Sequence, residues 1–165
     1  MESSDQILRN IKKLTPRRLG YMAAIIDGEG CVRIQNGRIL RISVGNTSTK
    51  LLKFLNNKIG GAAYRIHSGK HSGVGKIGGI INGRKIIHRK ISYSWRISGD
   101  SAHFLLLRIL DDLIIKKEAA KWALKFRKTF AHGVRYRRGG LSELVWNRRK
   151  LISTKVNRHN KGAKL

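Results

Sequence analysis

The chain has 165 residues, of which 41% are hydrophobic, and its 36 lysines and arginines against 9 acidic residues give a formal net charge of +27. This length and apolar content predict one folded domain, residues 1–165, and exclude a disordered basic tail. The charge favours nucleic acid as the partner, since a polyanion relieves repulsion among the cations; no stretch can span a bilayer, so we expect no membrane partner.

One cysteine, Cys31, excludes an internal disulfide and a cysteine-based zinc site. A lone thiol fits a reducing compartment, and the N-terminus has no signal-peptide pattern. We therefore expect an intracellular protein, either in the cytoplasm or nucleoid or in an organelle.

The first half of the chain predicts two helices followed by a hairpin. Residues 3–14 place isoleucine and leucine at helical spacing, and Thr15-Pro16 is typical of a helix start. That second helix is expected to run to about Asp27 and to end at Gly28. Beyond it, apolar and polar residues alternate on both sides of Asn36-Gly37, which predicts two strands joined by a tight turn.

The second half repeats the pattern and then becomes helical. The predicted elements are a helix from Leu51 to Ile59, strands around Ala62–His67 and Lys90–Ile97, a helix from Asp100 or Ser101 through Ile114, a helix over Lys116–Phe130 and a basic helix over Leu141–Val156. The glycine-rich, cationic segment between the second pair of strands predicts a long mobile hairpin tip. Two hairpins with matching amphipathic faces predict an α+β fold, in which one antiparallel sheet has helices behind and cations in front.

Small residues recur every four positions along the second helix, at Gly20, Ala24 and Gly28, so they lie on one face. Such a face lets another helix approach closely. The sequence has no second copy of the segment, so the partner helix would belong to another subunit and the chain would form a homodimer. The alternative is that this face packs against the chain's own sheet.

Two carboxylates, Asp27 and Glu29, follow this face in a very basic chain. Carboxylates close to a polyanion repel it unless a cation lies between them. Mg²⁺ fits, because it takes oxygen ligands and often uses one or two carboxylates together with substrate phosphates. The alternative is a solvated turn.

The stretch MAAIIDGEG, Met22–Gly30, closely resembles the nine-residue signature of the LAGLIDADG homing endonucleases. The αββαββα order over residues 15–130 resembles the fold of that family, whose curved antiparallel sheet forms a DNA-binding saddle. Residues 131–165 would then be a basic, helical C-terminal extension. The resemblance implies a dimer interface made of Gly20, Ala23, Ala24, Asp27 and Gly28.

The resemblance also implies the site residues. Glu29 would bind the catalytic divalent metal, helped by the carbonyl of Gly28, and Asp27 would either ligate the metal or support the turn. Asn46 would position the nucleophilic water, with Lys50 one helical turn later. Lys116, or its neighbour Lys117, would be the basic catalytic residue. Asn46 could instead be a helix cap and Lys116 a solvated cation.

The implied activity is that of an intron-encoded, Mg²⁺-dependent DNA endonuclease. As a homodimer it would recognise a long pseudo-palindromic site in double-stranded DNA and hydrolyse phosphodiesters to leave short 3′ overhangs. We expect Mn²⁺ to substitute for Mg²⁺, Ca²⁺ to support binding without cleavage, and no organic cofactor to be needed.

Strand parity and charge select the candidate DNA contacts. On the sheet they are Arg33, Gln35, Arg41, Ser43, Arg65, His67, Ser92, Ser94 and Arg96, and on the turn and hairpin tip Arg38, Lys70, Lys76, Arg84 and Lys85. Arginine to guanine and glutamine to adenine are favoured pairings. We therefore expect Arg33, Gln35 and Arg41 to read bases.

Two other functions would also explain the charge. An RNA-binding or intron-maturase protein could share the fold but would not need Glu29, and a ribosomal-type protein would not dimerise in high salt. A serine- or histidine-based enzyme has no support, because the six histidines show no ligand spacing.

Overall fold

A computed structural model of the chain describes residues 3–65, 77–81, 84–87, 92–129 and 143–160. In chain order the elements are α1 (Ser4–Lys12), α2 (Pro16–Glu29), β1 (Gly30–Gln35), β2 (Ile39–Asn46), α3 (Thr49–Ile59), β3 (Ala62–Arg65), β4 (Ile77–Ile81), β5 (Arg84–Ile87), β6 (Tyr93–Ser98), α4 (Gly99–Ile109), α5 (Lys117–Arg127) and α6 (Glu143–Asn160). Only the backbone is described for residues 64, 65, 77–81 and 84–87.

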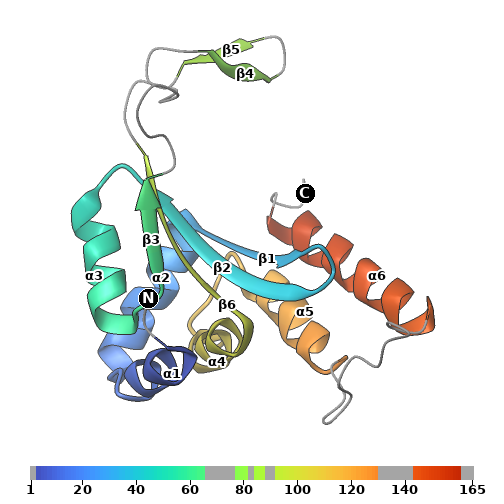
Figure 1. The fold of residues 1–165 in the computed structure, drawn as a ribbon, viewed down its shortest axis with the longest axis horizontal. Helices are drawn as coiled ribbons and strands as arrows, with labels where there is room; N and C mark the ends of the chain where they lie inside the picture. The colour runs from blue at the N-terminus through green and yellow to red at the C-terminus, as the bar shows by residue number, and fades with distance from the viewer. Residues whose placement is uncertain (1–2, 66–76, 82–83, 88–91, 130–142, 161–165) are drawn as a thin grey trace.

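Four strands form one antiparallel sheet in the order β1-β2-β6-β3, and the short pair β4-β5 forms a separate sheet. Helices α2, α3, α4 and α5 contact the strands of the larger sheet from one side (Figure 1). The predicted α+β fold, with two hairpins in one antiparallel sheet and helices behind it, is therefore confirmed.

The core lies between the sheet and these helices, and the period-of-two pattern determines which strand residues enter it. Val32 and Ile34 of β1, Ile42 of β2 and Trp95 of β6 are buried, whereas Arg33 on β1 is exposed and Arg41 on β2 is half-buried. Trp95 also donates its indole N–H to the carbonyl of Gly60 at 2.7 Å, so its polar atom is satisfied inside the core.

The predicted turn between β1 and β2 is confirmed. Asn36 has φ 50° and Gly37 has φ 61°. Two consecutive residues with positive φ are typical of the tight turn that asparagine and glycine favour. Three residues, 36–38, separate the paired Gln35 and Ile39. The turn fixes the register in which Arg33 faces Arg41 across the two strands.

Two predicted helix ends are wrong. The helix predicted to run through Ile114 ends at Ile109, as α4. Gly28 does not end the second helix, because α2 continues through Glu29 and its C-terminal cap is Gly30. The predicted hairpin tip between Ala62–His67 and Lys90–Ile97 contains strands of its own, β4 and β5, which pair with each other.

The basic C-terminal extension contains α6, which packs against α5 and against β1, the edge strand of the sheet. Its buried residues include Arg149, which donates from Nε to the hydroxyl of Thr129 at 2.9 Å and lies over the Phe126 ring at the end of α5. A cation at a helix C-terminus interacts favourably with the helix dipole. No helix in the described part of the chain is both long and apolar enough to cross a membrane.

Candidate functional site at the end of helix α2

The exposed side chain of Glu29 lies where α2 passes directly into β1. The next residue, Gly30, must lack a side chain at this junction. A Cβ atom there would lie 2.5 Å from the carbonyl oxygen of Ile26 and 2.7 Å from its Cα. The helix can therefore pass into the strand without an intervening loop, and Glu29 is held at the boundary between a rigid helix and a rigid strand.

Asp27 is buried, and its carboxylate is bound to the segment that leads into α5. One oxygen accepts backbone N–H groups from Ile114 at 2.6 Å and Ile115 at 3.2 Å, and the other accepts from Lys116 at 2.9 Å. Three backbone donors on one carboxylate form a strong, charge-assisted anchor. This arrangement favours the turn-supporting alternative for Asp27.

Lys116 is buried beside the same residue, and its ammonium group donates to the main-chain carbonyl of Asp27. This contact lies two residues from Glu29. Lys117 instead donates to the carbonyl of Asp111 at 3.2 Å on the surface. Of the two predicted basic residues, only Lys116 is brought to the end of α2.

Asn46 reaches the same end of the sheet from β2. The register pairs Gly30 with Val44, so Asn46 lies two residues further along β2, about 7 Å beyond that pair and level with the end of α2. Its side-chain oxygen accepts the N–H of Ser48 at 2.7 Å, in a turn that leads into α3. Lys50 is exposed in the first turn of α3.

The face of the sheet away from the helices is cationic. Arg33 is exposed on β1, while Arg41 on β2 and Arg96 on β6 are half-buried. Arg33 lies directly opposite Arg41, so two cations are adjacent on this face. The outward parity predicted for Gln35, Ser43 and Arg96 is observed.

Two of the predicted DNA contacts have little exposed surface, and six others have no described side chain. Ser94 has the outward parity but is only 6% exposed, because it is a small residue on a central strand. Ser92 precedes β6 and is half-buried. His67, Lys70 and Lys76 lie outside the described residues, and Arg65, Arg84 and Lys85 are described only as strand backbone.

The predicted interface face of α2 requires one correction. Ala23 is fully buried in the chain's own core, on the face that also carries Met22 and Ile26, so it cannot contact a second subunit. Ala24 and Gly28 are exposed and Gly20 is half-buried.

Open space lies in front of this face. A Cβ atom added at Gly20 or at Gly28 would meet nothing within 4 Å. Ile114 and Ile115, whose backbones are bound to Asp27 beside this face, are 86% and 70% exposed. An apolar, uncovered surface of this kind is typical of a contact with another molecule.

The donor set at the end of α2 fits a divalent cation of the Mg²⁺ type. Such ions take oxygen ligands and keep several waters, so one carboxylate and a helix-terminal carbonyl suffice as the protein's share. Glu29 and Gly28 provide these two groups, and both residues are exposed. Among the described residues, no group of three or more histidine, cysteine or acidic side chains forms a closed metal cage.

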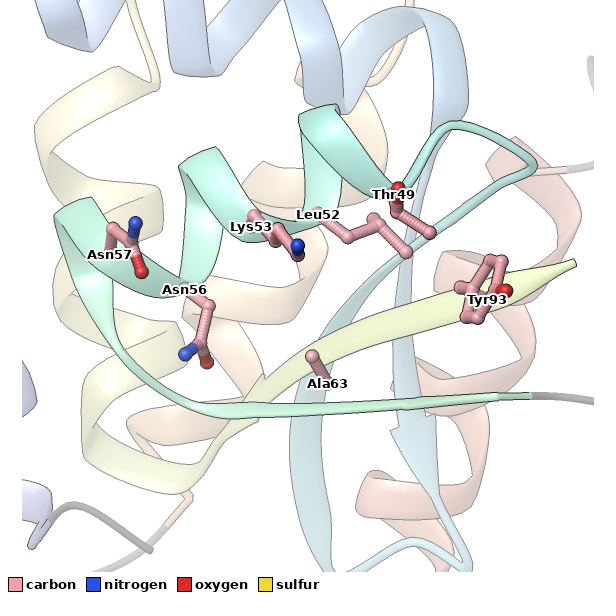
Figure 2. A pocket seen from close by; sticks show the side chains of 7 residues that line it. All are labelled: Thr49, Leu52, Lys53, Asn56, Asn57, Ala63 and Tyr93. Carbon is pink, nitrogen blue, oxygen red and sulfur yellow. The ribbon is translucent and has the colours of Figure 1, made fainter.

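A separate hollow lies on the helix side of the sheet, between α3 and the strands β3 and β6 (Figure 2). Its lining residues are Thr49, Leu52, Lys53, Asn56, Asn57, Ala63 and Tyr93. This lining contains no acid, thiol or histidine, so the hollow has the groups for polar contacts but none for metal binding or nucleophilic chemistry.

The contacts that hold α6 against the sheet are long-range and were not predictable from the sequence. The side chain of Asn160 pairs with both backbone groups of Val32, accepting its N–H at 3.3 Å and donating to its carbonyl. An amide side chain in this position acts as the next strand would, and it covers an otherwise open sheet edge. The two residues are 128 positions apart, so no local pattern could indicate the contact.

No protein-family model matches the chain, and no curated protein matches it significantly by sequence. Solved structures of the homing endonuclease I-CvuI are similar in fold. One, in complex with the I-CreI target and 2 mM Mg with the DNA not cleaved, has a TM-score of 0.59 at 15% identity and covers 90% of this chain and 85% of that chain. Another, in complex with its own target and 2 mM Ca, has a TM-score of 0.60 at 15% identity and covers 95% and 87%. The chain therefore has the fold of homing endonuclease structures.

Proposed function

We propose that this chain is a homing endonuclease of the LAGLIDADG type, encoded by an intron, which cuts both strands of a long pseudo-palindromic DNA site as a homodimer. The observation that supports it most is the position of Glu29. An exposed carboxylate at the end of a helix, in a chain of net charge +27, lies at the beginning of a strand whose outer face is cationic. A polyanion bound to that face would bring its phosphates next to this carboxylate.

Glu29 and the carbonyl of Gly28 would hold a divalent cation, which when bound neutralises the charge that develops on the phosphate. Lys116 adds a positive charge beside them, and Asn46 provides an amide to orient water at the same end of the sheet. Asp27 acts through its backbone contacts and holds Lys116 in place. Mg²⁺ is the expected ion, Mn²⁺ would substitute, and Ca²⁺ would support binding without cleavage.

The homodimer would form through Gly20, Ala24 and Gly28 of two copies of α2, with Ile114 and Ile115 at the margin of the contact. A two-fold axis along this contact places two copies of Glu29 near each other, one for each DNA strand. Short 3′ overhangs are expected from such an arrangement.

The test begins by selecting cleaved sites from a randomised DNA library in Mg²⁺. On a selected site, Glu29→Gln should bind with unchanged affinity while the cleavage rate falls by a factor of at least about 100, because a metal ligand is removed but the surface that contacts DNA is not. Gel shift in Ca²⁺ and a cleavage time course measure the two effects.

Glu143→Gln is the matched control, since it removes an equally exposed carboxylate from α6 and should cut like the wild type. Retained cutting by Glu29→Gln would refute the metal assignment. Binding of structured RNA by the wild type and Glu29→Gln alike, without any DNA cleavage, would favour the RNA-binding alternative.

A further inference from the structure

A polar groove runs between the β1–β2 turn and the side of α6. Its lining residues are Asn36, Gly37, Arg38, Trp146, Lys150, Ser153 and Thr154. Two of them are cations and none is an acid. Trp146 closes the groove at one end by packing over the turn: a Cβ atom added at Gly37 would lie 3.3 Å from the indole ring.

The groove has fixed walls, because α6 is held against β1 at intervals of seven residues. Trp146 contacts the turn, the hydroxyl of Ser153 donates to the carbonyl of Ile34 at 3.3 Å, and Asn160 pairs with Val32. Seven residues are about two helical turns, so these contacts follow one line along the helix. The cations of α6 therefore keep a constant position relative to the outward residues of β1.

The groove opens on the same side of the sheet as Arg33. The inward side of α6 is defined by Ile152 and Val156, which are buried, and Lys155 lies over the Trp122 ring of α5 at 4.0 Å. Each residue advances the helix by about 100°. Around the helix, Lys150 and Thr154 come after the residues that contact β1. They therefore project on the side of α6 that faces away from α5.

We propose that this groove binds a phosphate of the DNA backbone at the outer end of each half-site, and that Arg38 and Lys150 hold it. The proposal rests on the proposed function. β1 spans six residues, so the turn lies about 20 Å from Glu29, which corresponds to about six base pairs along the duplex. Two cations beside fixed walls suit a phosphate, which positions a protein on DNA without reading its sequence.

The experiment measures DNA affinity in Ca²⁺, so that it does not depend on cutting. Arg38→Gln and Lys150→Gln are compared with wild type on two duplexes that share the selected site: a long one, and one truncated about five base pairs from the centre on both sides. Arg148→Gln is the matched control, because it removes an exposed cation from the same helix outside the groove.

On the long duplex, each groove variant should weaken binding about tenfold and reduce the slope of log affinity against log salt by about one. On the truncated duplex both should bind like wild type, which also shows that they fold. Arg148→Gln should match wild type on both duplexes.

The groove would not be a backbone-binding site if the groove variants lost the same affinity on both duplexes. The same conclusion would follow if Arg148→Gln lost as much affinity as Lys150→Gln. Unchanged affinity and salt slope of both groove variants on the long duplex would also lead to this conclusion. A failure of the proposed function is seen separately, as a wild-type chain that binds the long duplex but does not cut it in Mg²⁺, or whose cutting survives Glu29→Gln.

Discussion

At the scale of single residues, Asp27 connects the end of α2 to the segment before α5. Its carboxylate accepts three backbone N–H groups, and its carbonyl accepts the ammonium of Lys116. Both carboxylate oxygens are thus engaged inside the chain, whereas Glu29 is exposed. We therefore propose separate tasks for the two acids, with Asp27 supporting the structure.

Asp27→Asn tests this division. The amide keeps one acceptor but turns an NH₂ group toward backbone donors, so the free energy of unfolding should fall by about 1–3 kcal/mol. The cleavage rate should also fall as Lys116 loses its support, while the Mg²⁺ concentration for half-maximal cleavage stays the same. Urea unfolding and a metal titration measure these quantities. A large rise in the Mg²⁺ requirement would instead make Asp27 a ligand.

Gly30 is required for space rather than for its dihedral angles. Its φ is −84°, which any residue adopts, but a Cβ atom would collide with the backbone of Ile26. Gly30→Ala should therefore force the last turn of α2 and the start of β1 apart, at a cost of about 1–3 kcal/mol in unfolding free energy, and should slow cleavage by displacing Glu29.

Gly45→Ala is the control, because the nearest atom to its Cβ would be the Tyr93 carbonyl oxygen at 4.0 Å. Its unfolding free energy should stay within about 0.5 kcal/mol of wild type. Equal stability of Gly30→Ala and Gly45→Ala in denaturant unfolding would contradict the close approach.

At the scale of elements, the two faces of α2 differ in burial. The core face carries Ala23 and Ile26, and the outer face carries Gly20, Ala24 and Gly28. Because Ala24 and Gly28 on the outer face are exposed, Ala24→Leu should leave the monomer's stability unchanged. It should weaken dimerisation, since a larger side chain holds the two helices apart.

Sedimentation equilibrium of Ala24→Leu measures the effect directly. Lys12→Leu, which adds the same side chain at an exposed position of α1, is the control and should keep the wild-type mass. An unchanged dimer mass for Ala24→Leu would refute the proposed interface.

Elements with a local sequence pattern could be predicted, whereas features that depend on packing could not. The strands β1 and β2 and their turn were predictable, because alternation and the Asn36-Gly37 signal are local properties. The motif predicted Glu29 just beyond a helix that stops at Gly28, whereas the helix continues through Glu29 itself. Ala23 was misplaced because adjacent alanines differ by about 100° around a helix, and only packing decides which one faces the core.

Long-range contacts were beyond sequence reasoning. The partners of Asp27 lie 87 to 89 residues away and are backbone groups, which carry no residue signature. The position of α6 beside β1 depends on Asn160 and Ser153, polar residues that no hydrophobic pattern singles out. The groove between α6 and the turn could therefore appear only in three dimensions.

At the scale of the whole molecule, the chain has 36 lysines and arginines but only 9 acidic residues. Some of these cations are neighbours in space, since Arg33 lies directly opposite Arg41 in the sheet. The net charge of +27 repels within the free protein, and we expect bound DNA to relieve that repulsion. Salt should therefore stabilise the free protein, because it screens the repulsion among its cations. It should weaken the DNA complex, because salt cations compete with the protein for the phosphates.

We predict that rising salt increases the thermal unfolding midpoint of the free protein and weakens its DNA complex. A protein that makes about six to ten phosphate contacts loses about three to five orders of magnitude in affinity over a fourfold rise in salt. Differential scanning fluorimetry and DNA binding in the same salt series measure the two trends. A midpoint that falls with salt, or an affinity that changes by less than about tenfold across the series, would show that the charge serves a purpose other than gripping a polyanion.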